Sequence, residues 1–175
     1  MRYLELLTVL LVWTTAGCER QHSQSGSAGA ASAAAEAARL DQRRPLPLLP
    51  AMAQEQKMNM REHLSAVQQT VAGLAAGDFA AIETASKRLG MSPERHAMCE
   101  RLAAGSDDFK SQAMGFHRTA DSIGEAAHAR DAKAVSLALS HTLASCTGCH
   151  ESFRQEVVDQ ATWQKLMASR GGGGK

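Results

Sequence analysis

The sequence of 175 residues is almost balanced in charge, with 19 Lys and Arg against 18 Asp and Glu and a formal net charge of +1. That balance does not indicate a nucleic-acid or polyanion partner. Aromatic residues make up only 4% of the chain and alanine is abundant, which favours helices. We find no nucleophile–base pair, no phosphate-binding loop and no second metal motif, so the sequence does not indicate an enzyme.

Residues 1–18 have the pattern of an export signal. Arg2 precedes an apolar run over residues 6–13, which is too short to span a bilayer. The run leads into Thr-Ala-Gly-Cys, so Cys18 is a candidate for lipidation of the kind found in bacterial lipoproteins. Ordinary signal cleavage near Ala30 is the alternative. Either route predicts export, and lipidation of Cys18 would anchor the chain to a membrane.

Residues 19–51 are low in complexity. They are rich in Ser, Gly, Gln and Ala and then contain Pro45, Pro47 and Pro50. With so little apolar bulk, this segment is predicted to be a disordered N-terminal tether with a stiffer proline-containing end. The folded domain is predicted to span residues 52–168. Residues 169–175, which end in four glycines and a lysine, are predicted to be disordered.

Four helices are predicted within the folded domain. The first covers about residues 52–76, where apolar residues recur at intervals of four and three, the spacing of a buried helix seam. The members of this seam are Met60, Leu64, Val67, Val71 and Leu74. Gly77 is expected to end the helix, and Asp78 is expected to cap the next one.

The second helix is predicted to be interrupted. It stops at Gly90 and resumes at Pro93, because Ser92 before a proline has the pattern of a helix start. Cys99 lies in the second half and is interpreted as a small buried side chain, with a reactive or dimer-linking thiol as the alternative.

The third helix follows Ser106 and has its own seam. Its members are Phe109, Ala113, Phe116, Ala120, Ile123 and Ala127. His117 and His128 stand beside this seam and are expected at the surface or its boundary, with a role as a ligand as the alternative. Asp131 is expected to cap the fourth helix.

The fourth helix contains the pentapeptide Cys146-Thr147-Gly148-Cys149-His150, which has the Cys-x-x-Cys-His pattern of covalent haem attachment. Two thiols at this spacing form thioethers with the two vinyl groups of a haem, and the histidine that follows binds the iron. A thioredoxin-like thiol pair would require a βαβ pattern around it, and a zinc site would require another Cys/His pair. The sequence contains neither, so we predict one haem c per chain.

The motif lies on a stripe with the same intervals of four and three. Its members are Leu139, Leu143, Cys146, His150, Phe153 and Val157. This stripe predicts that the helix continues through residue 157 and that His150 points inward.

The stretch from Cys146 to Val158 resembles the cytochrome c′ family, the class II cytochromes c, whose motif continues to an aromatic residue and an arginine. Phe153 and Arg154 match those two positions. The resemblance implies an all-α, antiparallel four-helix bundle with haem on the last helix. It covers about residues 52–160 in the order of helices, but only the motif is sharply specific.

The resemblance also implies that the first helix meets the far side of the haem. Met60 lies close to the position of the family's axial methionine, and a thioether is a suitable iron ligand. His63 is a rival ligand, and a sixth position without a protein ligand is the third alternative. Leu64 and Val67 would line the haem pocket, and Arg154 is the family-matched candidate for shaping the proximal side. Many family members have an arginine where this chain has Gln56.

These residues lead us to expect a one-electron carrier of the bacterial periplasm or cell envelope, which exchanges electrons with redox partner proteins. A high-spin protein that binds NO or CO is the alternative. A third possibility is an interaction protein in which the haem only stabilises the bundle. Members of the family often dimerise, so a homodimer is also considered.

Overall fold

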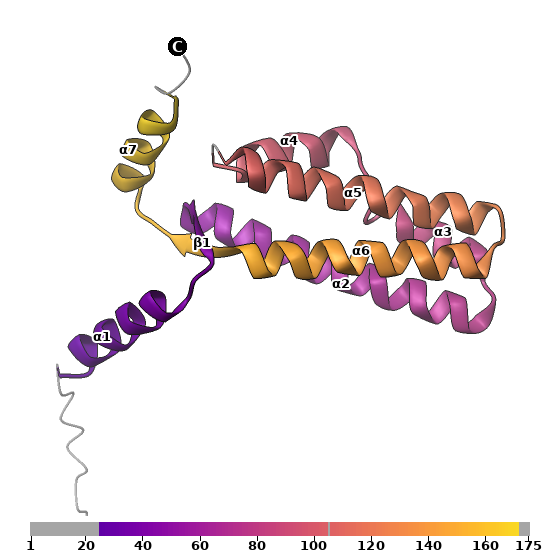
Figure 1. Ribbon diagram of the computed structural model, residues 1–175, viewed down its shortest axis with the longest axis horizontal. Coiled ribbons are helices and arrows are strands. Elements are labelled where there is room, and N and C mark those ends of the chain that lie inside the picture. The colour runs from indigo at the N-terminus through magenta and orange to yellow at the C-terminus, as the bar shows by residue number, and fades with distance from the viewer. Residues whose placement is uncertain (1–24, 105, 172–175) are drawn as a thin grey trace, which may run out of the picture. The chain divides into compact units, whose positions relative to one another are not determined.

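The computed structural model describes residues 25–171 with the exception of residue 105, and over these residues the chain is mostly helical (Figure 1). The chain divides into two compact units, residues 1–42 and 43–175. In the first unit the structure describes helix α1 (Ser25–Leu40). Cys18 and residues 172–175 lie outside the described residues.

The second unit contains the other elements in the order β1, α2 to α6, β2 and α7. Their bounds are β1 (Arg44–Leu48), α2 (Pro50–Ala76), α3 (Phe79–Ser86), α4 (Pro93–Leu102), α5 (Asp107–His128), α6 (Ala132–Ser152), β2 (Phe153–Val157) and α7 (Gln160–Gly171). The prediction of a mainly helical protein is confirmed. The interrupted second helix corresponds to α3 and α4.

Polar caps begin the helices where the sequence predicts them. The side chains of Asp78, Ser92, Ser106 and Asp131 each accept a hydrogen bond from a backbone amide three residues on. Such bonds satisfy amides that have no partner within the first turn of a helix. Gly77 ends α2 with φ at 67°, a left-handed conformation that favours glycine.

The larger core cluster lies between the long helices. α6 packs most extensively against α5, α3 packs against both α2 and α5, and α2 meets α6 over only a short region. In Figure 1, α6 runs antiparallel to both α2 and α5. The bulkiest buried members of this cluster are Ile82, Leu89, Phe116, Ile123, Val135 and Leu139. The seam predicted from Phe109 to Ala127 is buried except for Ala113, which is half-buried.

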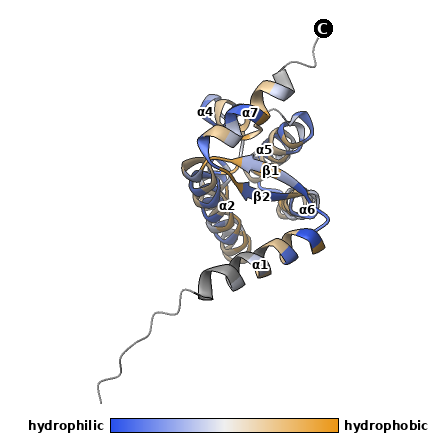
Figure 2. Cartoon of the chain, turned by 90° about the vertical axis from the view of Figure 1, so that its left-hand side faces the viewer, coloured by the Kyte–Doolittle hydropathy of each residue, from blue (hydrophilic) through white to orange (hydrophobic). Residues whose placement is uncertain are grey.

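The two short strands pair in parallel, although the 104 residues 49–152 lie between them in the sequence. Leu46 aligns with Gln155 and Leu48 with Val157, and the Val158 amide donates to the Leu48 carbonyl at 3.0 Å. In this register the backbone groups of Leu46 and Leu48 point toward β2, so the prolines that alternate with them occupy positions whose nitrogens point away from it. Figure 2 shows the strands between α2 and α6.

A second core cluster surrounds this sheet. It includes Leu46, Leu48, Leu102, Phe109 and Phe153, and both leucines of β1 are at most 2% exposed. The expectation of a disordered tether through residue 51 therefore differs from the structure, which has a helix over residues 25–40 and a strand over 44–48 whose last three residues are buried. The strand depends on a partner far along the chain, which a local composition pattern does not reveal.

The fourth predicted helix ends earlier than expected. α6 stops at Ser152, and Phe153 has extended backbone angles of φ −128° and ψ 147°. The continuous stripe predicted through Val157 is therefore wrong beyond Ser152, and Val157 is 55% exposed. After β2, α7 extends through Gly171, whereas residues 169–171 were predicted to be disordered.

Candidate functional site

The three motif residues lie on the last two turns of α6. At about 100° per residue, Cys146, Cys149 and His150 fall within about 100° of the helix surface. Both cysteines are half-buried, Cys146 against the larger core cluster and Cys149 against the second one. The helix thus presents two sulfur atoms and an imidazole on one side, at the junction of the two clusters.

The half-buried positions of the two thiols favour their uncharged form. Burial raises the pKa of the Cys146 thiol, and burial together with the charge of Cys146 raises the pKa of Cys149. Redox-active thiol pairs have a lowered pKa instead, because they react as thiolates. Among the described residues both are free cysteines, as is the buried Cys99. This environment suits uncharged thioethers better than a redox-active pair.

His150 lies at the exposed edge of α6. The buried stripe of this helix consists of Val135, Ala138, Leu139 and Thr142. His150 is exposed, and so is Leu143 at 41%. The expected inward orientation of His150 and Leu143 is therefore wrong, because the buried stripe is centred between Cys146 and Cys149. The His150 carbonyl accepts a hydrogen bond from the Arg43 guanidinium at 3.3 Å.

The apolar seam predicted on α2 lies mostly on its outer side. Met60 is 41% exposed, Leu64 69% and Val71 51%, whereas Val67 and Leu74 are half-buried against the larger cluster. The residues that are buried instead are Ala53, Gln56, Ala66, Thr70 and Gly73.

The small side chains of α2 explain this rotation. A Cβ atom at Gly73 would lie 2.7 Å from Cγ1 of Ile82, so α3 approaches α2 as closely as a glycine allows. The close contact turns the small residues inward and leaves the larger ones outside. We call the exposed set Met60, Leu64 and Val71 the α2 apolar stripe. It is a row of large side chains that the described residues leave uncovered.

His63 points into the protein. Its ring stacks against Phe116, with centroids 4.8 Å apart, and lies edge-on to His117 at 5.4 Å. Burial, with smaller contributions from His117 and Arg95, lowers the pKa of His63 to about 4. Met60 and His63 therefore lie in different environments, although they are only three positions apart in the sequence.

His117 corrects a second prediction. It was expected at the surface or its boundary but is 2% exposed, and its Nδ1 lies 2.6 Å from the Leu89 carbonyl oxygen. Burial lowers its pKa as well. His128, in contrast, is exposed as predicted, with its side chain 87% accessible.

Phe153 and Arg154 follow the motif on β2 instead of on a helix. Phe153 is buried edge-to-face against Phe109 at 5.3 Å, and the Arg44 guanidinium lies 4.3 Å from the Phe153 ring centroid. The Arg154 side chain is 19% exposed and lies 3.6 Å from Glu156, and its Nε has no hydrogen-bond partner among the described residues. Arg154 is thus held by strand geometry and not by a helical turn after His150.

Sequence analysis did not identify the groups that join this end of α6 to α2. Gln155 donates from Nε2 to the Ala53 carbonyl at 3.3 Å and also to the side-chain oxygen of Gln56. Met52, Met98 and Met167 pack against the same cluster as Cys149. The alternation of leucine and proline over residues 45–48 was the only signal in the sequence for the strand that organises these contacts.

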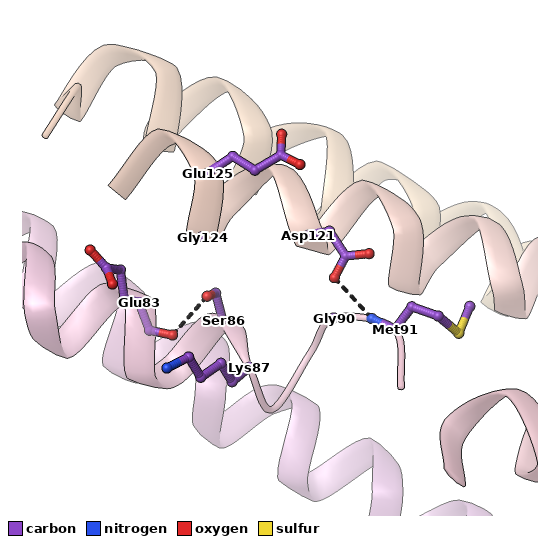
Figure 3. A pocket seen from close by; sticks show the side chains of 8 residues that line it. All are labelled: Glu83, Ser86, Lys87, Gly90, Met91, Asp121, Gly124 and Glu125. Carbon is purple, nitrogen blue, oxygen red and sulfur yellow. Dashed lines mark hydrogen bonds between the residues drawn. The ribbon is translucent and has the colours of Figure 1, made fainter. Parts of the chain in front are cut away.

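A separate hollow of about 430 Å³ lies between α3 and α5 (Figure 3). Asp121 accepts a hydrogen bond from the Met91 amide at 2.9 Å there, and a Cβ atom at Gly90 would lie 2.2 Å from the Asp121 carboxylate. The carboxylates of Glu83 and Glu125 also line it. None of the site residues predicted from the sequence lines this hollow.

The described residues contain no cluster of three or more His, Cys, Asp or Glu side chains arranged to hold a metal ion. None of their helices is both long enough and apolar enough to cross a membrane. Comparisons of the chain with protein-family models, with curated proteins and with solved structures found no match.

Proposed function

We propose that the protein is a c-type cytochrome that binds one haem covalently through Cys146 and Cys149, with His150 as an axial iron ligand. The observation that supports this most is the shared face of α6, on which two half-buried free thiols stand beside an exposed imidazole. A soft sulfur pair and a neutral nitrogen donor are the groups that haem c requires.

Exposed apolar side chains on α2 and α6 offer contacts for a large apolar group. The α2 apolar stripe leaves Met60 and Leu64 exposed, and Leu143 near the motif on α6 is also exposed. Exposed apolar rows of this kind mark binding sites. Leu64 and Val67 on α2, with Phe153 and Arg154 on β2, are the residues that we propose for the haem pocket. When bound, a haem iron supplies a one-electron couple between its ferrous and ferric states.

We propose Met60 as the sixth ligand. Its thioether lies on the exposed side of α2, whereas His63 is stacked on Phe116 inside the protein. Binding through His63 would require that packed ring to leave its contacts with α5. Ligation by histidine and methionine raises the reduction potential of a haem, which suits an electron carrier.

We also propose that the helices form a cytochrome c′-like four-helix bundle, in which α3 and α4 together stand for one interrupted helix. The helical order and the antiparallel course of α6 support this. This chain departs from the family pattern in three features. The motif helix ends at Ser152, a parallel strand pair follows it, and Gln56 occupies the position of the common arginine.

In this proposal the protein transfers single electrons between redox partner proteins of the bacterial periplasm or cell envelope. The export pattern of residues 1–18 supports that location, and lipidation of Cys18 would hold the protein at a membrane. The alternative is a protein that binds NO or CO at an open sixth position. The 69% exposure of Leu64 favours the alternative, because it indicates an open side of α2.

The test measures both the absorption spectrum and the intact mass of the exported full-length protein. We expect the mass of one added haem and a low-spin spectrum. The double variant C146S/C149S should lose the covalent haem, whereas C99S should keep it. M60A should lose the low-spin signature, and M58A, which changes another exposed methionine of α2, should retain it. A colourless wild-type protein would refute the proposal. A five-coordinate spectrum that changes under CO would favour the alternative.

A further inference from the structure

The charged residues of α2 fall into two groups with different partners. The helix has two acidic residues, and both are paired: Glu62 lies 2.7 Å from the Arg88 guanidinium, and Glu55 pairs with Arg101. The two long basic side chains, Lys57 and Arg61, are exposed, and the described part of the chain contains no ion-pair partner for either. The positive charge of α2 is therefore left uncompensated at these two residues.

The two cations border the α2 apolar stripe. Residues three and four apart are neighbours on a helix surface, so Lys57 and Arg61 adjoin each other. By the same spacing Lys57 adjoins Met60, and Arg61 adjoins Leu64. Gln68 continues the row one turn beyond Leu64 and is also exposed. We call Lys57, Arg61 and Gln68 the Lys57–Arg61 patch.

The patch contains two exposed, unpaired cations and no acidic residue. Exposed charges of one sign select the sign of the partner and accelerate the encounter. Glu55 and Glu62 are each paired with an arginine from another helix or turn, so their charges are already compensated.

We infer that the Lys57–Arg61 patch is the docking surface for an acidic redox partner protein. The inference rests on the proposed function, because the patch adjoins Met60, the proposed ligand, and would lie beside the route by which electrons leave. Electron-transfer complexes are small and short-lived, so a patch of this size with complementary charge is sufficient for a productive encounter.

The experiment measures the bimolecular oxidation of the reduced, haem-loaded full-length protein. The anionic oxidant is hexacyanoferrate(III), and the cationic one is tris(phenanthroline)cobalt(III). In each reaction one electron passes from the protein to the oxidant, which becomes hexacyanoferrate(II) or the cobalt(II) complex. We expect the rate with the anion to fall as salt is added, because salt screens attraction between exposed charges.

The test variant is K57E/R61E, and the matched control is K133E/K165E. The control changes the net charge by the same amount at two other exposed lysines, which also lack an ion-pair partner among the described residues. We expect K57E/R61E to slow oxidation by hexacyanoferrate(III) about tenfold at low salt and to accelerate oxidation by the cobalt complex. The control should have a clearly smaller effect on both rates.

Equal effects of the two double variants would overturn the inference, because they would show that only the total charge matters. An altered reduction potential with unchanged salt dependence would also overturn it, since the cations would then contact the haem carboxylates and not a partner. Circular dichroism verifies that the variants keep their helices. A colourless wild-type protein would refute the proposed function itself, before these rates could be measured.

Discussion

The imidazole rings of His63 and His117 meet edge to face between α2 and α5, with their centroids 5.4 Å apart. His117 is buried and His63 is half-buried, and the positive charge of Arg95 acts against protonation of both. Glu62 near His63 and Asp121 near His117 act in the opposite direction but do not outweigh burial. The pair is therefore neutral at pH 7 and packs as an aromatic contact.

This contact predicts that the protein loses stability in acid. His63 has a pKa of about 4 when folded and 6.5 when unfolded, so between these values only the unfolded chain takes up the proton. The contribution of His63 is fully present above pH 6.5 and falls by up to about 3 kcal/mol as the pH falls to 4. Urea unfolding at intervals from pH 7 to 4 measures this loss.

The matched variants are H63F and H128F. H63F keeps an aromatic ring against Phe116 but has no titrating group, so its unfolding free energy should depend less on pH than that of the wild type. H128F changes a histidine that is 87% accessible and should follow the wild-type profile. An H63F profile as steep as that of the wild type would show that other groups cause the acid sensitivity.

The burial of strand β1 leads to a second, independent prediction about the unfolding free energy. Leu48 is fully buried in the sheet cluster, so L48A should lower the unfolding free energy by about 2–5 kcal/mol through lost contacts and a residual cavity. L40A is the control, because Leu40 of α1 is 71% exposed and its loss should cost less than about 0.5 kcal/mol. Urea unfolding measures both. A loss of unfolding free energy for L48A as small as that for L40A would mean that β1 contributes nothing to the core.

The local features of this fold could be predicted from the sequence. Ser92 before a proline, Asp78 after Gly77, and Asp131 before an alanine-rich run each identify a helix start by hydrogen-bonding chemistry that acts within a few residues. The seam from Phe109 to Ala127 was also predictable, since its partner helix α6 is the next element along the chain. The spacing of Cys146, Cys149 and His150 was likewise local, so their common face follows from helix geometry alone.

Features that depend on distant partners could not be predicted in this way. β1 is a strand only because β2 offers its backbone groups, and the helix ends at Ser152 because Phe153 joins that sheet. The seam predicted on α2 was wrong for Met60, Leu64 and Val71, which lie on the exposed side of the helix. Gly73 allows α3 to pack on the small residues, so Met60 and Leu64 remain outside. The burial of His117 likewise depends on the Leu89 carbonyl, which is contributed by the turn after α3.

Two glycines should respond to alanine in opposite directions. Gly77 ends α2 with φ at 67°, so G77A would place a side chain in a left-handed conformation and should lower the unfolding free energy by about 1 kcal/mol. Gly115 lies inside α5, where an added Cβ atom meets nothing within 4 Å. G115A should therefore raise the unfolding free energy by up to about 1 kcal/mol, because alanine favours the helix. Urea midpoints at pH 7 measure both changes. A stabilising G77A would show that α2 does not end in the left-handed turn, and a destabilising G115A would show that α5 is covered at that position.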